Sequence, residues 1–195
     1  MKAFRLITGI VVSLALLAAS TSGRAQEDKL PLNLSARAIN MSNVAAGDRT
    51  ALVDVRITRW STDAERDRLI QTFVEKGPTK LLDALQDVKP AVGFIRLPQT
   101  LAYDLRFARR MPLEDGGWRV LLVTDRPISP AEAMRQPRTM DYPFTLIEIH
   151  MKKDGTGEGK LSLATKITRN EKDKVVEIEN WATEPVRLTN IRVAK

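Results

Sequence analysis

The sequence contains no cysteine and only one histidine, His150. A chain without cysteine forms no disulfide bond, so a packed core must supply its stability. A single imidazole and no thiolate also exclude most zinc, copper and iron sites, because those metals need several such ligands. We therefore expect neither a metal nor another cofactor.

Runs of like charge are also missing, although Asp, Glu, Lys and Arg make up 28% of the residues. No five consecutive residues carry the same charge, and the two signs are interspersed. Such mixing is typical of a solvated surface, whereas a nucleic-acid-binding tract concentrates Lys and Arg. We expect no nucleic-acid partner, and the sequence indicates no particular oligomeric state.

The one long apolar run lies at the amino terminus. Lys2 and Arg5 precede a stretch of about 14 apolar residues, and small residues follow it. This layout predicts a secretory signal peptide over residues 1–25, cleaved after Ala25 or, as an alternative, after Ser22. A retained membrane anchor is the other interpretation, but the run is shorter than the ~20 residues that span a bilayer. We expect an exported protein, periplasmic or secreted, without a transmembrane segment after cleavage.

Cleavage would remove three cations and no acidic residue, which lowers the net charge from +7 to +4.

The remaining length suits one domain with a sizeable core. Residues 26–50 are polar and are predicted to form a loose N-terminal segment, within which residues 32–39 fit a short edge strand. Residues 51–195 are predicted to form a single β-rich domain, because they contain neither an internal repeat nor a low-complexity linker.

Alternation of apolar and polar residues predicts most of the domain to be strands. Val53, Val55 and Ile57 alternate with polar residues, which is the pattern of a half-buried strand. Similar segments follow, and the short turns between them favour antiparallel neighbours. The predicted strands cover residues 51–60, 91–97, 101–109, 118–125, 144–152, 160–168, 175–181 and 186–193.

Two helical regions interrupt the strands. Thr62 and Glu65 have the spacing of a capping box, and an apolar stripe follows them. Gly77 and Pro78 then fit the end of one helix and the start of another, so a helix pair is predicted over residues 62–88. A second capping box at Ser129 predicts a short helix over residues 130–135.

We therefore predict an α+β fold, predominantly antiparallel β, with the amphipathic helix pair inserted after the first strand. Residues 91–125 would form a three-strand meander and residues 144–193 a four-strand meander. Together they would form a curved sheet or an eight-stranded barrel-like domain, which leaves few exposed strand edges. A two-sheet sandwich is the alternative.

The turn over residues 153–159, "KDGTGEG", separates two predicted strands. Asp154, Thr156 and Glu158 place oxygen atoms at alternate positions, as a calcium loop does. The three intervening glycines favour a hairpin in which they supply positive φ, so we expect no metal here.

His150 is a candidate catalytic residue because Glu148 precedes it by two positions. On a strand the two side chains point to the same face, where a carboxylate can orient an imidazole. Asp141 is a candidate helper. No Cys and no G-x-S-x-G motif supplies a nucleophile. The structural interpretation, which we favour, places Glu148 and His150 at the solvated end of a strand whose other end is covered.

A ligand-binding site is predicted where aromatic and arginine side chains occur on neighbouring strands. Arg106 has the fork geometry that binds carboxylates and phosphates. The structural alternative pairs the arginines with nearby aspartates and uses the aromatic residues to seal the ends of the strands. The candidate ligand-binding residues are Tyr103, Arg106, Phe107, Trp118 and Tyr142, the last of them in the long connection over residues 124–144.

Three stretches, "GFIRLPQTLAYDLRFAR", "VTDRPI" and "TMDYPFTLIEIHM", resemble segments of uncharacterised exported bacterial proteins. The resemblance implies a cell-envelope location and no particular activity. The sequence alone thus favours an exported, non-enzymatic β-rich module that binds a small ligand or an envelope partner. An exported hydrolase or isomerase that uses Glu148 and His150 is the alternative.

Overall fold

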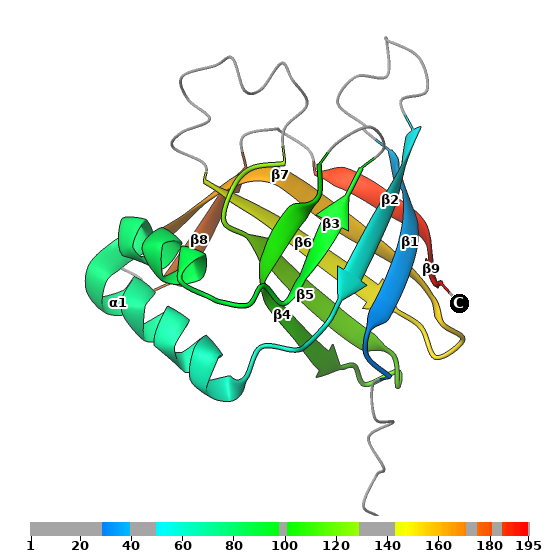
Figure 1. The fold of residues 1–195 in the computed structure, drawn as a ribbon, viewed down its shortest axis with the longest axis horizontal. Coiled ribbons are helices and arrows are strands. Elements are labelled where there is room, and N and C mark those ends of the chain that lie inside the picture. The colour runs from blue at the N-terminus through cyan, green and yellow to red at the C-terminus, as the bar shows by residue number, and fades with distance from the viewer. Residues whose placement is uncertain are drawn as a thin grey trace, which may run out of the picture.

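The structure, a computed structural model, describes residues 29–39, 50–97, 101–128, 143–170, 175–180 and 185–194. Within these residues the chain forms nine strands and one helix (Figure 1). The strands are β1 (Leu32–Ile39), β2 (Thr50–Ile57), β3 (Gly93–Arg96), β4 (Tyr103–Pro112), β5 (Trp118–Thr124), β6 (Phe144–Met151), β7 (Thr156–Asn170), β8 (Val175–Asn180) and β9 (Val186–Val193), and the helix is α1 (Asp63–Gln86).

Eight of these strands form a closed antiparallel barrel. Neighbours follow the order β6-β5-β4-β3-β2-β1-β9-β7, and β7 also pairs with β6, which closes the ring. The predicted antiparallel, barrel-like fold is confirmed, and the sandwich alternative is wrong. The strand at Leu32–Ile39 is present, but it lies between β2 and β9 and is therefore not an edge strand.

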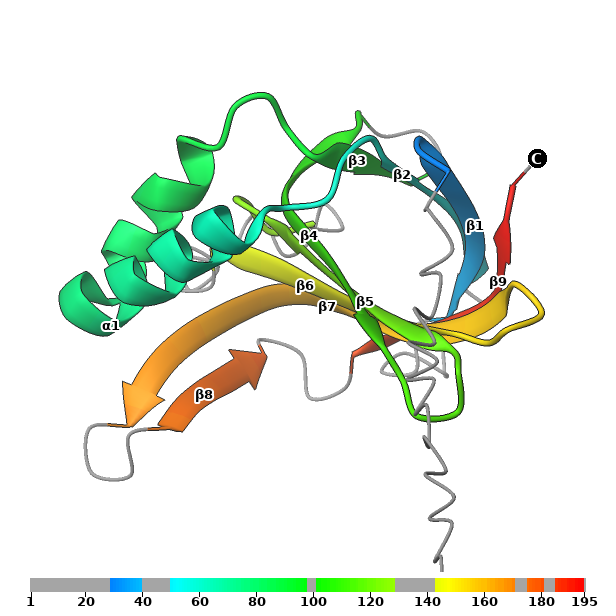
Figure 2. The same cartoon turned by 90° about the horizontal axis from the view of Figure 1, so that it is seen from below.

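The predicted four-strand meander over residues 144–193 is wrong in one connection. β8 follows β7 as expected, but β9 pairs with β1 and with the first half of β7 instead of with β8. The reason is the length of β7, whose 15 residues serve two partners along one edge. Thr156–Leu161 pairs with β9, and Thr165–Asn170 pairs with β8 outside the barrel (Figure 2).

The interior of the barrel is a continuous apolar cluster. Because side chains alternate across a strand, one apolar set per strand points inward. Every barrel strand contributes, and several members are completely shielded from solvent. The buried members include Leu34, Val53, Ile95, Leu105, Leu122, Ile147, Leu161 and Leu188.

Helix α1 packs against the outside of the barrel. Leu69, Phe73, Leu81 and Leu85 form its buried stripe and join a second cluster with outward side chains of β4, β5, β6 and β7. This cluster includes Phe144, which is fully buried. Figure 2 shows the helix lying beside the strands and not at either end of the barrel.

The predicted helix pair is not confirmed as two separate helices: residues 63–86 are one element, α1, which is broken internally at Gly77. The capping box is present: the Glu65 amide donates to the Thr62 hydroxyl, and the Thr62 amide donates to the Glu65 carboxylate. Gly77 has a φ of 81°, outside the helical range, and Pro78 follows it. The glycine bends the chain, but helical turns continue directly on both sides, with no connecting loop between two helices.

The start of α1 is tied to strand β4. The backbone N–H of Ser61 donates to the Ala108 carbonyl, and the Ala108 N–H donates to the Ser61 hydroxyl. Arg109 forms an ion pair of 2.8 Å with Asp63 in the first helical turn. Ser61 therefore has a structural role, because it joins the start of α1 to β4.

The hairpin prediction for residues 153–159 is correct, but only one of its glycines uses positive φ. Gly155 has a φ of 80°. Gly157 and Gly159 lie in β7, where a Cβ atom would come within 2.6 Å of the His150 carbonyl oxygen and 2.5 Å of the Glu148 carbonyl oxygen, respectively. These two glycines allow β7 to approach β6 closely.

Two predicted segments, the signal peptide over residues 1–25 and the short helix over residues 130–135, lie outside the described residues. The one helix in the described part of the chain is not a candidate for spanning a membrane, since it lacks the required apolar length.

Candidate functional site

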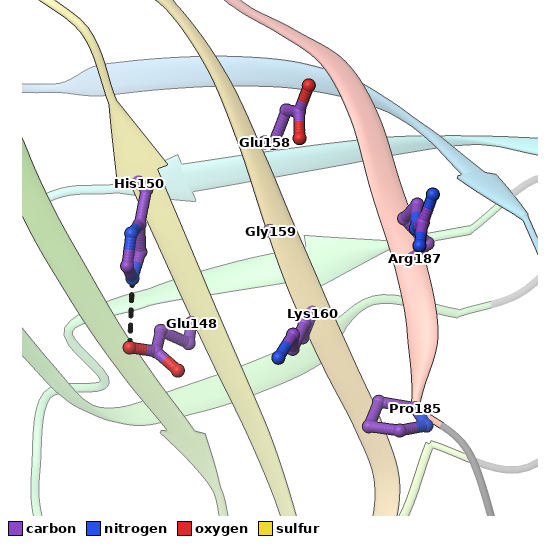
Figure 3. Close-up of a pocket in the computed structure, with 7 residues that line it drawn as sticks. All are labelled: Glu148, His150, Glu158, Gly159, Lys160, Pro185 and Arg187. Atoms are coloured by element: carbon purple, nitrogen blue, oxygen red, sulfur yellow. Dashed lines mark hydrogen bonds and ion pairs between the residues drawn. The ribbon is translucent and has the colours of Figure 1, made fainter.

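A groove lies on the outer surface of the barrel, where β6, β7 and β9 run side by side (Figure 3). Its volume is about 830 Å³, within the range of small-ligand sites. The inward neighbours of its charged residues, such as Ile149 and Leu161, belong to the barrel core, so the groove faces solvent. Its described lining consists of Glu148, His150, Glu158, Gly159, Lys160, Pro185 and Arg187.

Strand register brings the charged side chains into two rows. Glu148 lies opposite Lys160 on β7, and Lys160 lies opposite Arg187 on β9. His150 lies opposite Glu158 in the second row. Acidic and basic groups therefore alternate from β6 to β7, whereas two basic groups meet at the boundary between β7 and β9.

Glu148 and His150 are in direct contact. The His150 Nε2 atom lies 3.0 Å from Glu148 Oε1, and the Arg119 guanidinium lies 3.5 Å from the same oxygen. The hydrogen bond from His150 is the main cause that lowers the pKa of Glu148, and Arg119 and Lys160 add to the effect. Glu148 is therefore ionised at neutral pH and holds the imidazole in one orientation.

The groove offers limited catalytic chemistry. Glu148 orients His150 as a general base requires, but none of the seven described lining residues carries a hydroxyl or thiol nucleophile. The His150 side chain is 55% exposed, so water surrounds much of it. This position corresponds to the structural interpretation of the sequence, because Phe144 and Leu146 at the other end of β6 pack in the cluster under α1.

The predicted ligand-binding residues do not converge on one site. Phe107 is buried in the cluster beneath α1. Arg106 forms ion pairs with Asp125 at 3.1 Å and Asp104 at 3.2 Å, and it donates to the Val88 carbonyl. This pairing is the structural alternative that the sequence offered for the arginines.

Tyr103 and Trp118 lie at opposite ends of the barrel. Tyr103 begins β4, whereas Trp118 pairs with Pro112 at the end of the same strand, roughly 30 Å away along an extended chain. Both pack against the barrel core. A guanidinium covers each ring, that of Arg126 over Tyr103 and that of Arg110 over Trp118. These aromatic residues therefore cover the ends of the core.

Asp141 and Tyr142 lie outside the described residues, so their candidate roles stay predictions. Sequence reasoning missed Glu158, Lys160, Pro185 and Arg187 as members of a common groove. The alternation within each strand indicates that the charged ones point outward. Their convergence depends on the pairing of β7 with both β6 and β9, which no local pattern reveals.

A metal site is not supported by the described residues. Among them, no three His, Cys, Asp or Glu side chains are grouped closely enough to hold an ion. In the turn between β6 and β7, Asp154 accepts hydrogen bonds from the Thr156 amide and hydroxyl, as expected for a turn.

The fold and the groove together define a closed antiparallel β-barrel with an apolar interior, an external helix and a charged outer groove. Comparisons with protein-family models, with curated proteins and with solved structures give no match. The resemblance to exported bacterial proteins therefore stays a prediction.

Proposed function

We propose that this chain is an exported, non-enzymatic binding module that holds its partner on the outer groove of β6, β7 and β9. The observation that carries the proposal is the contrast between the two sides of these strands. Inward residues such as Ile147 and Leu188 form a continuous buried cluster, and the concave, charged surface lies outside. Because apolar side chains occupy the barrel interior, we place partner binding on the outer surface.

This arrangement favours an external partner over a ligand enclosed by aromatic side chains. The candidate residues Tyr103 and Trp118 are distant from each other, and Phe107 is covered by α1. The groove instead exposes acidic and basic side chains to solvent, where they can form hydrogen bonds with a partner. Mixed charge gives specificity for a complementary polar partner more than it gives raw affinity.

The export part of the proposal rests on the leader pattern of residues 1–25. A secretion host that expresses the full chain should deliver a shortened protein outside the cytosol, with an intact mass that corresponds to cleavage after Ala25 or Ser22. Recovery of the full-length mass in the cytosol alone would contradict export.

The binding part is tested by the molecules that co-purify with the exported protein. Mass spectrometry should identify a species that wild type retains and that Lys160→Glu loses, because the change reverses a charge in the groove. Arg56→Glu is the matched control, since Arg56 is an exposed cation on β2, away from the groove. Equal retention by all three proteins, or no bound species from any of them, would contradict the proposal.

A second function, hydrolysis or isomerisation, is supported by one observation: the 3.0 Å contact between Glu148 and His150. In this case His150 would act as a general base, and water would be the attacking group in a hydrolysis. A panel of 4-nitrophenyl esters tests the hydrolase version. Activity that His150→Ala removes and that Arg56→Gln, a change on β2 outside the groove, preserves would favour the enzyme, and activity unchanged in His150→Ala would exclude this role.

A further inference from the structure

The groove contains two basic residues that face each other directly. Lys160 on β7 and Arg187 on β9 are partners in the antiparallel register, and both are exposed. Opposed positions hold Cβ atoms roughly 5 Å apart, where like charges destabilise a sheet. Among the residues that the structure describes, neither side chain forms an ion pair with a carboxylate.

The carboxylate that lies opposite Lys160 in the register already contacts other groups. Glu148 faces Lys160 across the β6–β7 pair, but its Oε1 atom contacts His150 and Arg119. Figure 3 shows the Lys160 ammonium group directed toward β6 and Glu148, while the Arg187 side chain lies over β9. Strands β7 and β9 therefore contribute two opposed cationic side chains to the groove, and the carboxylate opposite Lys160 also contacts His150 and Arg119.

We propose that this side of the groove binds the phosphate group of its ligand, between Lys160 and Arg187. Two opposed cations match a compact group with close to two negative charges, and such an anion relieves their mutual repulsion. A guanidinium supplies a planar pair of donors to phosphate oxygens, and an ammonium supplies a mobile point charge. The inference deepens the proposed function, on which it rests, by naming the chemistry that the groove recognises.

The acidic residues restrict the ligand. Glu158 is on the same face of β7, two positions before Lys160, and it lies opposite His150. A second anionic group that extended toward Glu158 would be repelled. The site therefore suits a single phosphate group, free or at the end of a larger molecule, and disfavours a polyanion such as a nucleic acid.

Titration of the mature protein with inorganic phosphate, followed by ¹⁵N–¹H NMR, tests the inference. Amide shifts should concentrate at Gly159, Lys160 and Arg187. Arg187→Gln and Lys160→Met should each weaken phosphate binding by about tenfold or more, since each removes a charge-assisted contact. Arg56→Gln is the matched control and should leave binding unchanged. Sodium acetate at equal ionic strength should produce no comparable response.

A second arm distinguishes a lipid headgroup from free phosphate. Vesicles of phosphatidylcholine alone are compared with vesicles that also contain phosphatidic acid. Binding to the second kind only, lost in Arg187→Gln, assigns the phosphate to a lipid; phosphate-induced shifts without vesicle binding assign it to a soluble ligand. Either result supports the inference.

Two results would overturn it. One is phosphate binding that is equal in wild type, Arg187→Gln and Arg56→Gln; the other is no response to phosphate or to either vesicle. Circular dichroism establishes that each variant is folded, and the shift map of wild type decides the question if a variant is not. If phosphate fails but Lys160→Glu still loses the co-purifying species, the groove binds another chemistry, and the proposed function survives.

Discussion

Strand β6 presents two different surfaces along one outer face. Phe144 and Leu146 belong to the cluster that α1 covers, whereas Glu148 and His150, on the same face, line the open groove. The outer face changes from apolar to charged between Leu146 and Glu148, which are successive outward residues of β6. β7 shows the same division, because Lys160 lies in the groove and Ile167 packs with the cluster under α1.

The comparison shows how one sheet surface serves both stability and recognition. Apolar outward residues mark the area where the helix docks, and burial of their surface stabilises that contact. Charged outward residues mark the area left to solvent, where each ion pair contributes little to stability. Substitutions in the two areas should therefore separate loss of stability from loss of binding.

The largest effect is expected in the area under α1. Phe144→Ala should lower the free energy of unfolding by about 3–5 kcal/mol, because it leaves a cavity in a fully buried position. Urea denaturation followed by circular dichroism measures the change. Leu52→Ala is the control: Leu52 is 66% exposed on β2, and its change should stay within about 0.5 kcal/mol. Similar losses in both variants would contradict the role assigned to the helix contact.

A smaller loss is expected beneath the groove. Gly159→Ala should destabilise the protein by about 1–3 kcal/mol, because the added Cβ atom lies 2.5 Å from the Glu148 carbonyl oxygen and β6 must move away from β7. The β6 amide signals should shift with it in NMR spectra. Ser162→Ala, three residues further along β7, is the matched control. A stable Gly159→Ala protein with an unchanged β6 would show that the close approach is not required.

Loss of the helix cap should have an effect of about 1 kcal/mol. Thr62→Ala removes the hydroxyl that accepts from the Glu65 amide at the start of α1. Thermal unfolding measures the decrease, and Thr62→Ser, which keeps the hydroxyl, should restore most of it. If Thr62→Ser were as unstable as Thr62→Ala, the cap would not be the cause.

The smallest effect is expected at Glu148, and it should depend on pH. Contact with His150 lowers the pKa of this carboxyl in the folded protein, so its ionised form contributes stability above the ordinary glutamate pKa of about 4.3. That contribution is lost as the pH falls through the lowered folded value. Glu148→Gln should therefore be less stable than wild type by under about 1 kcal/mol at neutral pH.

The difference in stability between wild type and Glu148→Gln should shrink as the pH falls below the ordinary glutamate pKa of about 4.3. Parallel urea titrations at neutral and acidic pH measure it. A difference that grew on acidification would have the wrong sign for a carboxyl whose pKa is lowered by folding, and it would contradict the assigned contact.

Local sequence pattern predicted where most helices and strands lie, but it did not predict which strands pair with each other. Alternation predicted β2 and β9 closely, and the Thr62 and Glu65 spacing predicted the start of α1. The pattern at Gly77 and Pro78 predicted a break, and the helix is interrupted there, but the two parts form one element, α1. Local pattern failed at β8 and β9, because one edge of β7 pairs with both strands: its first half with β9 and its second half with β8.

For the site, the sequence by itself determined that Glu148 and His150 share a face, because the two-residue period of a strand is a local property. It also determined which residues are apolar enough to fill a core. Only the tertiary structure decided that Lys160 and Arg187 meet, that the groove opens outward and that Trp118 and Tyr103 lie apart. Those outcomes depend on pairing between distant segments and on closure of the barrel, whose register is a property of the whole sheet and not of any one strand.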